Sequence, residues 1–227
     1  MLQRKNRVGI VLAVLSVVAF LGALSMVFGY APQETTMGDV QRIFYFHVAS
    51  AWVGFFGFFV TFVAGIMYLV REERRWDIVA ASSAEIGLAF ITMTLLTGML
   101  WAKPVWGVYW TWEPRLTISA VQWLLYVAYV MLRGSVASPE REARFAAVYG
   151  ILAFVTVPLS WFAIRWWRTI HPQVVSSEGM AITTRMVQTL LTSIGVFTLI
   201  YVTLVRQRIR LALAQDALAA LQLAQES

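Results

Sequence analysis

The sequence predicts an all-α integral membrane protein with six transmembrane helices and a tryptophan-rich interfacial loop at its outer face. Two observations favour this fold class. Hydrophobic residues make up 59% of the 227-residue chain and charged residues only 13%, whereas about a quarter of a soluble domain is charged. The apolar residues also form long uninterrupted runs, and a helix needs about 20 such residues to cross a hydrocarbon core of roughly 30 Å.

Six apolar runs account for the predicted helices of a single membrane domain over residues 1–227. The first follows MLQRKNRVG and is longer than the apolar region of a signal peptide, so we expect a retained helix. The fourth is short and has to gain a turn from its flanks or tilt little. Helices are the natural choice because they satisfy their backbone hydrogen bonds within one span. The six runs are 8–30, 45–70, 78–100, 117–132, 145–163 and 183–205.

The distribution of Lys and Arg predicts the orientation. Twelve of the eighteen basic residues lie in the N-terminal segment, in 71–77, in 133–144 and in the tail 206–227. Cytoplasmic segments carry the excess of Lys and Arg, so we expect both termini in the cytoplasm and the loop 101–117 outside. The net charge of +6 then reflects topology, and no nucleic-acid partner is expected. The tail is predicted to be helical, either as a loose amphipathic extension or as a partner-binding helix.

The segment WAKPVWGVYWTWEPRLT, residues 101–117, holds four tryptophans. Tryptophan is normally enriched at both membrane interfaces, which predicts a roughly even division between the two sides. Here nine of the ten tryptophans lie in or beside predicted outer segments or in the outer halves of spans, and only Trp76 lies on the inner side. Indole rings stack on planar π-systems and on cations. The imbalance therefore predicts an aromatic surface for a flat apolar ligand at the outer face.

His47 and His171 are the only histidines, and both fall on the predicted outer side. Neutral imidazole is a good ligand for iron, copper or zinc. The chain has no cysteine, and no acidic cluster lies beside either histidine, so the two make a poor tetrahedral zinc site. They suit the axial positions of a haem iron. The alternative interpretation of each is a hydrogen-bonded polar residue at the interface.

Charged residues that oppose the expected pattern are further candidates. Guanidinium groups on the outer side could bind the carboxylates of haem propionates, and ordinary interfacial snorkelling is the alternative. Glu85 lies about two turns into the third run, where a carboxyl group is costly and a functional candidate. A polar cluster with Ser82, Ser83 or a neighbouring helix would also explain it. The arginine candidates are Arg42, Arg115, Arg165, Arg168 and Arg185.

Three segments carry a resemblance to a known family. WGVYWTWEPRLT resembles the tryptophan-rich WWD motif of haem-handling membrane proteins. QRIFYFHVASAW and VPLSWFAIRWWRTIHP resemble the two histidine segments that flank this motif in the haem exporter protein C family, also called cytochrome c maturation protein C. The resemblance covers most of residues 40–172. The chain departs from the pattern at Glu113–Pro114, where the family usually has Asp and a small residue, and at Tyr109, where Trp is common.

The resemblance implies a haem-binding protein that is not an enzyme. Haem b would be held at the periplasmic face of a bacterial inner membrane by His47 and His171 and presented to a haem chaperone during cytochrome c biogenesis. The implied partners are the subunits of an ABC transporter, a small one-span membrane protein and the periplasmic haem chaperone. The implied haem platform consists of Trp101, Trp106, Tyr109, Trp110, Trp112, Glu113, Trp166 and Trp167.

Two other classes of protein remain as alternatives. A b-type membrane cytochrome that exchanges electrons with quinone commonly pairs its histidines deep between helices, whereas His47 and His171 lie at predicted helix ends. A transporter of small molecules or haem should have broken helices with polar residues at the bilayer midplane. The first, second and fifth runs are poor in such residues.

Overall fold

The computed structural model describes residues 2–135, 138–167, 171, 175–176, 179–180 and 182–226, and it is built mainly of helices. The two short strands pair in an antiparallel arrangement. In chain order the elements are α1 (Leu2–Ser25), the π-helical turn η1 (Met26–Tyr30), the 3-10 turn η2 (Asp39–Arg42), α2 (Ile43–Arg71), α3 (Arg74–Trp106), α4 (Pro114–Leu132), α5 (Pro139–Phe154), α6 (Thr156–Trp166), β1 (Val175–Ser176), β2 (Gly179–Met180) and α7 (Thr184–Glu226).

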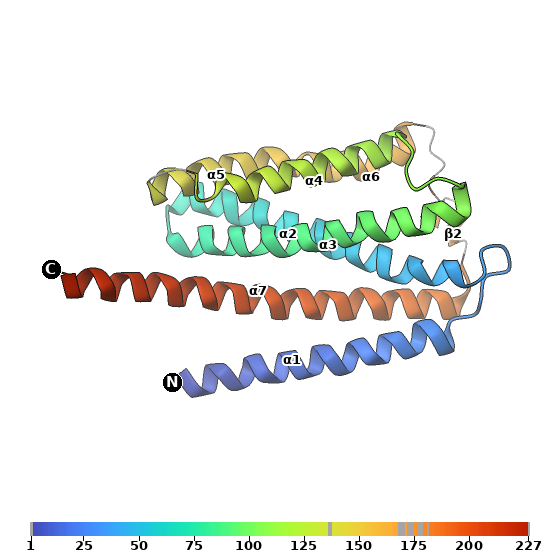
Figure 1. Ribbon diagram of the computed structural model, residues 1–227, viewed down its shortest axis with the longest axis horizontal. Coiled ribbons are helices and arrows are strands. Elements are labelled where there is room, and N and C mark those ends of the chain that lie inside the picture. The colour runs from blue at the N-terminus through green and yellow to red at the C-terminus, as the bar shows by residue number, and fades with distance from the viewer. Residues whose placement is uncertain are drawn as a thin grey trace.

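Within these described ranges, six helical segments are long and apolar enough to cross a membrane, which confirms the predicted fold class. An even number of crossings returns the chain to its starting side, and both termini lie at one end of the bundle (Figure 1). We call this the terminal end, and the opposite end, which carries residues 101–113, the tryptophan end. The six segments are Arg7–Tyr30, Asp39–Arg71, Arg74–Trp106, Pro114–Leu132, Pro139–Ala163 and Thr184–Gln225.

The helices pack in layers around the antiparallel pair α2 and α3. Helix α7 contacts α1, α2 and α3, and α4 contacts α3, α5 and α6. Figure 1 shows α7 between α1 and the α2–α3 pair, with α4, α5 and α6 on the opposite side of that pair. One polar contact between α1 and α7 joins the hydroxyl groups of Ser16 and Thr203 at 3.0 Å.

Glycines allow α2 and α3 to approach closely. A Cβ atom added at Gly57 would lie 3.0 Å from the Cα of Gly87 and 3.2 Å from the carbonyl oxygen of Ser83, and one added at Gly54 would collide with Ile91. Small residues at such positions let helix backbones come near each other in a bilayer, where helix association depends on packing. This contact fixes which residues of α3 face each turn of α2.

The non-helical part of the predicted loop 101–117 is shorter in the structure. Helix α3 continues past Pro104 and ends at Trp106, followed by Gly107 with φ of 78°. Pro104 lies in the last turn, so its missing N–H interrupts the backbone hydrogen bonding only there. Helix α4 begins at Pro114. Proline has no backbone N–H, and the first position of a helix does not need one. This start gives the short fourth run its additional turn.

The fifth crossing consists of two helices. Helices α5 and α6 meet at Val155, and Pro158 lies in the first turn of α6. A proline cannot donate a hydrogen bond to the preceding turn and clashes with the carbonyl group four residues earlier, which explains the break. The second half of the crossing ends at Trp166, at the tryptophan end.

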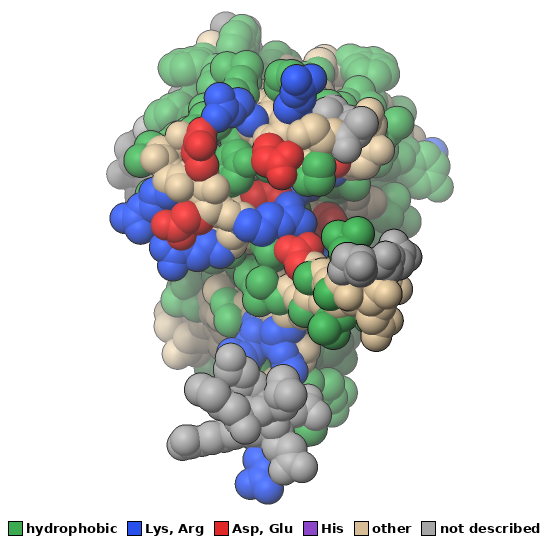
Figure 2. Space-filling model, turned by 90° about the vertical axis from the view of Figure 1, so that its left-hand side faces the viewer, with side chains coloured by type: hydrophobic (Ala, Val, Ile, Leu, Met, Phe, Trp, Pro, Cys, Tyr) green, Lys and Arg blue, Asp and Glu red, His purple; other side chains and the backbone are tan. Residues whose placement is uncertain are grey.

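A network of ion pairs occupies the terminal end. The buried carboxylate of Asp77 accepts hydrogen bonds from Arg133 Nη1 at 2.7 Å and Nη2 at 2.8 Å, and it also pairs with Arg74. Arg74 in turn pairs with Asp216 on α7 at 3.1 Å. Figure 2, which looks onto this end, shows acidic and basic side chains intermingled. The network joins the start of α3 to the end of α4 and to the extension of α7.

Replacement of Asp77 by Ala should destabilise the fold by about 3–5 kcal/mol, because it leaves the largely buried guanidinium group of Arg133 without its carboxylate. Asp216→Ala is the matched control. It removes a half-exposed pair with Arg74 and should cost about 0–1 kcal/mol. Reversible unfolding of the purified protein in detergent measures both. Equal losses of stability in the two variants would contradict the assigned role of Asp77.

Candidate ligand-binding site

His47 lies in the second turn of α2 and is oriented by α3. Its Nδ1 atom is 3.0 Å from the carbonyl oxygen of Thr94 and 3.2 Å from Oγ1 of Thr97. A carbonyl oxygen can only accept a hydrogen bond, so Nδ1 is the donor and, in the neutral ring, Nε2 keeps the lone pair. A Cβ atom at Gly98 would lie 3.1 Å from Cε1 of His47. The ring therefore has a defined tautomer and little room to move towards α3.

The structure brings the two histidines together, although they are far apart in the sequence. His171 lies in the connection between α6 and β1, and its ring centroid is 6.3 Å from that of His47, with an interplanar angle of 34°. A bond from a metal to an imidazole nitrogen is about 2 Å long, and the ring centre lies roughly 1 Å further, so two axial imidazoles have centres about 6 Å apart. The observed spacing fits two axial ligands of one iron.

Trp101 and Trp106 continue the site along α3. Trp101 lies one helical turn beyond Thr97, on the same face of the helix as the contacts to His47. Its ring meets that of Trp106 edge to face, with centroids 5.2 Å apart and an interplanar angle of 85°. The helical extension of α3 to Trp106 thus carries two indoles away from the histidine in a fixed direction.

The segment between α3 and α4 adds further aromatic surface. Trp110 and Trp112 meet edge to face at 5.9 Å, and Trp112 is 79% exposed, so its ring is no part of a core. Lys103 lies 5.4 Å from the centre of the Tyr109 ring. Nε1 of Trp110 and Oγ1 of Thr111 are buried without a hydrogen-bond partner among the described residues. Such groups normally find a partner, and a bound ligand could supply one.

The predicted arginine candidates occupy different surroundings. Arg115, in the first turn of α4, acts electrostatically on His47 and is itself influenced by Glu113. Arg42 instead donates hydrogen bonds to Asp39 and to the carbonyl oxygen of Val27.

The remaining arginines are less informative about the site. Arg185 lies over the ring of Tyr30 at 5.4 Å, which connects the start of α7 to η1. The side chain of Arg165 and the whole of Arg168 fall outside the described residues. Among the described arginines, Arg115 is therefore the best placed to reach a ligand of His47.

Trp166 and Trp167 lie at the end of α6, on the tryptophan end of the bundle. Their rings meet edge to face at 6.0 Å, and Trp166 stacks on Phe162 at 5.4 Å. Both tryptophans are about half exposed or more. Trp112, at the same end, is also exposed.

Glu85 lies away from this site and has a partner on another helix. Its carboxylate accepts hydrogen bonds from Nε and Nη2 of Arg208 on α7, the second at 2.9 Å. The hydroxyl group of Ser83 instead meets that of Tyr201 at 2.6 Å. Of the surroundings considered for Glu85, the structure therefore shows a polar contact with a neighbouring helix, α7.

Sequence reasoning missed the residues that orient His47. Thr94, Thr97 and Gly98 recur at helical spacing within an otherwise apolar run, which places them on one face of α3. That signal was present in the sequence. The sequence did not show that this face of α3 packs against α2, because that contact depends on the rotation of α3 about its own axis.

These features define a multi-pass membrane protein with a paired-histidine, tryptophan-lined site at one end of its helical bundle. A family profile described as Heme exporter protein C matches residues 1–224. The chain belongs to the haem exporter protein C family.

Similar proteins occur in bacteria and plants. Heme exporter protein C of Bradyrhizobium diazoefficiens is 34% identical over 199 residues, which cover 87% of this chain and 76% of the relative. The protein of the same name in Escherichia coli is 32% identical over 200 residues, with 88% and 81% covered. A putative cytochrome c biosynthesis ccmC-like mitochondrial protein of Marchantia polymorpha is 29% identical over 153 residues, with 67% and 64% covered.

Proposed function

We propose that this protein binds haem b at the tryptophan end and presents it to a haem chaperone during the biogenesis of c-type cytochromes. Membership of the haem exporter protein C family supports a role in haem handling. The observation that carries the proposal is the pairing of His47 with His171 at a ring separation of 6.3 Å. Its role is binding and positioning, with no bond of the haem made or broken by the protein.

The two imidazoles would supply the axial ligands of the iron. The porphyrin nitrogens would supply the other four positions. His47 is prepared for ligation because Thr94 accepts its Nδ1 hydrogen and leaves Nε2 for the metal. The haem itself supplies the vinyl groups to which a chaperone can attach.

The tryptophan-rich segment would bind the macrocycle and its carboxylates. Trp101 and Trp106 extend from the His47 contacts, and their rings offer apolar surface to a flat porphyrin. Nε1 of Trp110 and the Thr111 hydroxyl are hydrogen-bond donors that lack a partner among the described residues. With the guanidinium group of Arg115 they could bind propionate oxygens.

Presentation requires an open site. His47 is part of a continuous 29-residue helix, whereas His171 lies outside the helices, between α6 and β1. The exposed rings of Trp112 and Trp166 offer a surface on which a chaperone could dock. Further proposed partners are the subunits of an ABC transporter and a small one-span membrane protein, as the family resemblance implies.

The excess of Lys and Arg at the terminal end supports an orientation with both termini in the cytoplasm. In a bacterial inner membrane the tryptophan end would then face the periplasm, where c-type cytochromes acquire haem.

Replacement of either histidine tests the axial ligands directly. His47→Ala and His171→Ala should each lower the haem content of the purified protein and alter its Soret and α/β absorption bands. The chain has two histidines, so a change in the absorption bands can be assigned to the loss of one named imidazole ligand. Added imidazole should restore the bands of His47→Gly. Unchanged spectra in both variants would rule out the ligand assignment.

A side chain at position 98 should disturb His47 without removing it. Gly98→Val places atoms within the space that the imidazole ring occupies, and we expect roughly tenfold weaker haem binding, as for other changes around a metal ligand. Gly22→Val is the control, because nothing lies within 4 Å of a Cβ atom at Gly22. Haem titration followed by absorbance measures both variants. Equal affinities would show that the position of His47 is not limiting.

Combined replacement of Trp106, Trp110 and Trp112 by Leu should weaken haem binding more than roughly tenfold, since each aromatic pairing contributes about 0.5–1.5 kcal/mol beyond its burial. Trp76→Leu, at the terminal end, serves as the control. Haem uptake by membranes that contain each variant is the measurement. Full uptake by the triple variant would remove the platform from the proposal.

Fusions to alkaline phosphatase, which is active only outside the cytoplasm, test the orientation. A fusion after Trp112 should be active and one after Arg133 inactive, because a single helix, α4, separates the two positions. The reverse pattern would place the tryptophan end in the cytoplasm and overturn presentation to a periplasmic chaperone.

A further inference from the structure

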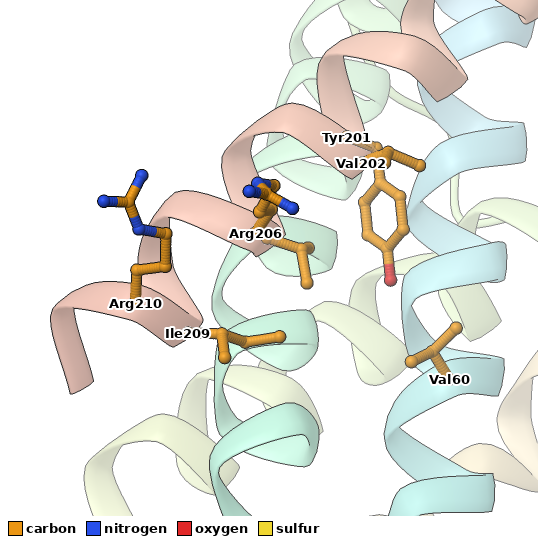
Figure 3. A pocket seen from close by; sticks show the side chains of 7 residues that line it. Val60, Tyr201, Val202, Arg206, Ile209 and Arg210 are labelled. Carbon is orange, nitrogen blue, oxygen red and sulfur yellow. The ribbon is translucent and has the colours of Figure 1, made fainter. Parts of the chain in front are cut away.

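A groove on the flank of α7 combines an apolar floor with basic groups at one end. It has a volume of about 640 Å³ and is lined by Val60 of α2 and by Tyr201, Val202, Val205, Arg206, Ile209 and Arg210 of α7. Figure 3 shows Val60, Tyr201 and Val202 on the right of the view, with Arg206, Ile209 and Arg210 further along α7 towards the terminal end.

The depth of the two arginines follows from the length of α7. Residues 186–205 carry no charge, and twenty helical residues span about 30 Å, the thickness of a hydrocarbon core. Arg206 therefore lies at the boundary between the acyl chains and the headgroups, and Arg210 lies one turn further out. Arg208 points to another side of the helix, where it pairs with Glu85.

Arg210 also lies close to α1. A Cβ atom at Gly9 would be 3.2 Å from Nη1 of Arg210, so this guanidinium group lies against the start of the first crossing. Arg7, one residue from the beginning of the uncharged stretch of α1, is exposed at the same end. The headgroup region beside the groove is thus positively charged.

The floor of the groove is unlike a helix–helix interface. Its apolar lining residues are large or β-branched, whereas close helix packing in membranes uses small residues. The pair α2 and α3 follows that rule at Gly54 and Gly57 of α2 and Gly87 of α3. Tyr201 contributes only its ring, because its hydroxyl group is bonded to Ser83. An acyl chain suits such a surface better than a partner helix does.

We propose that this groove is a binding site for an acidic phospholipid. The acyl chain lies along Val60, Val202 and Val205, and the phosphate is bound by Arg206 and Arg210. Arginine fits phosphate oxygens through paired hydrogen bonds, and basic pockets between helices on the cytoplasmic side bind anionic headgroups. The proposal does not depend on the haem site, which lies at the opposite end.

Native mass spectrometry of the delipidated protein tests the site with two lipids, dioleoyl-phosphatidylglycerol and dioleoyl-phosphatidylcholine. We expect preferential binding of phosphatidylglycerol. Arg206→Gln/Arg210→Gln should weaken it about 30-fold, because each basic residue near the surface contributes about 1 kcal/mol and a factor of ten corresponds to about 1.4 kcal/mol. Arg71→Gln/Arg141→Gln removes the same charge from exposed positions outside the groove and should leave the preference intact.

Val202→Trp fills the groove at a position that is 45% exposed, so the variant should fold. It should weaken the binding of phosphatidylglycerol while both arginines remain. Equal affinity for the two lipids, or equal losses in the two double variants, would overturn the proposal. The proposal would also be overturned if the Val202→Trp protein bound lipid normally but no longer co-purified with a membrane partner. The groove would then be the binding site of that partner.

Discussion

The close packing of α2 against α3 is the contact on which the rest of the structure depends. Gly57 and Gly87 allow the two backbones to approach, and this approach brings His47 within hydrogen-bonding distance of the Thr94 carbonyl group. Helices in a bilayer retain their backbone hydrogen bonds throughout, so they behave as stiff rods. A contact near the middle of the pair therefore also fixes the direction in which α3 carries Trp106 beyond the membrane.

The length of the apolar runs was sufficient to predict the fold class, because the bilayer imposes one thickness on every crossing. The third apolar run ends at residue 100, whereas α3 continues to Trp106. Pro is a poor helix former in a helix interior, but Pro104 lies in the last turn of α3, where its missing N–H interrupts the hydrogen bonding only locally. The end of α3 is determined by Gly107, whose positive φ reverses the chain.

The site was predictable in its residues and unpredictable in its contacts. His47 and His171 could be singled out because the chain has two histidines, and the tryptophans because they gather on one side. The partners of these residues depend on the rotation and depth of each helix. The pairing of Glu85 with Arg208 joins positions 123 residues apart, and no period in the sequence connects them.

The two ends of the bundle have opposite physical characters. At the terminal end, charges are paired across helices, as in Asp77 with Arg133, and a partly buried pair of this kind favours one arrangement of the helices over others. At the tryptophan end, the rings of Trp112 and Trp166 remain exposed. A protein that must hold and then release a large planar ligand benefits from this separation. The pairs that keep the helices in register lie far from the surface on which the ligand would be exchanged, so exchange need not disturb them.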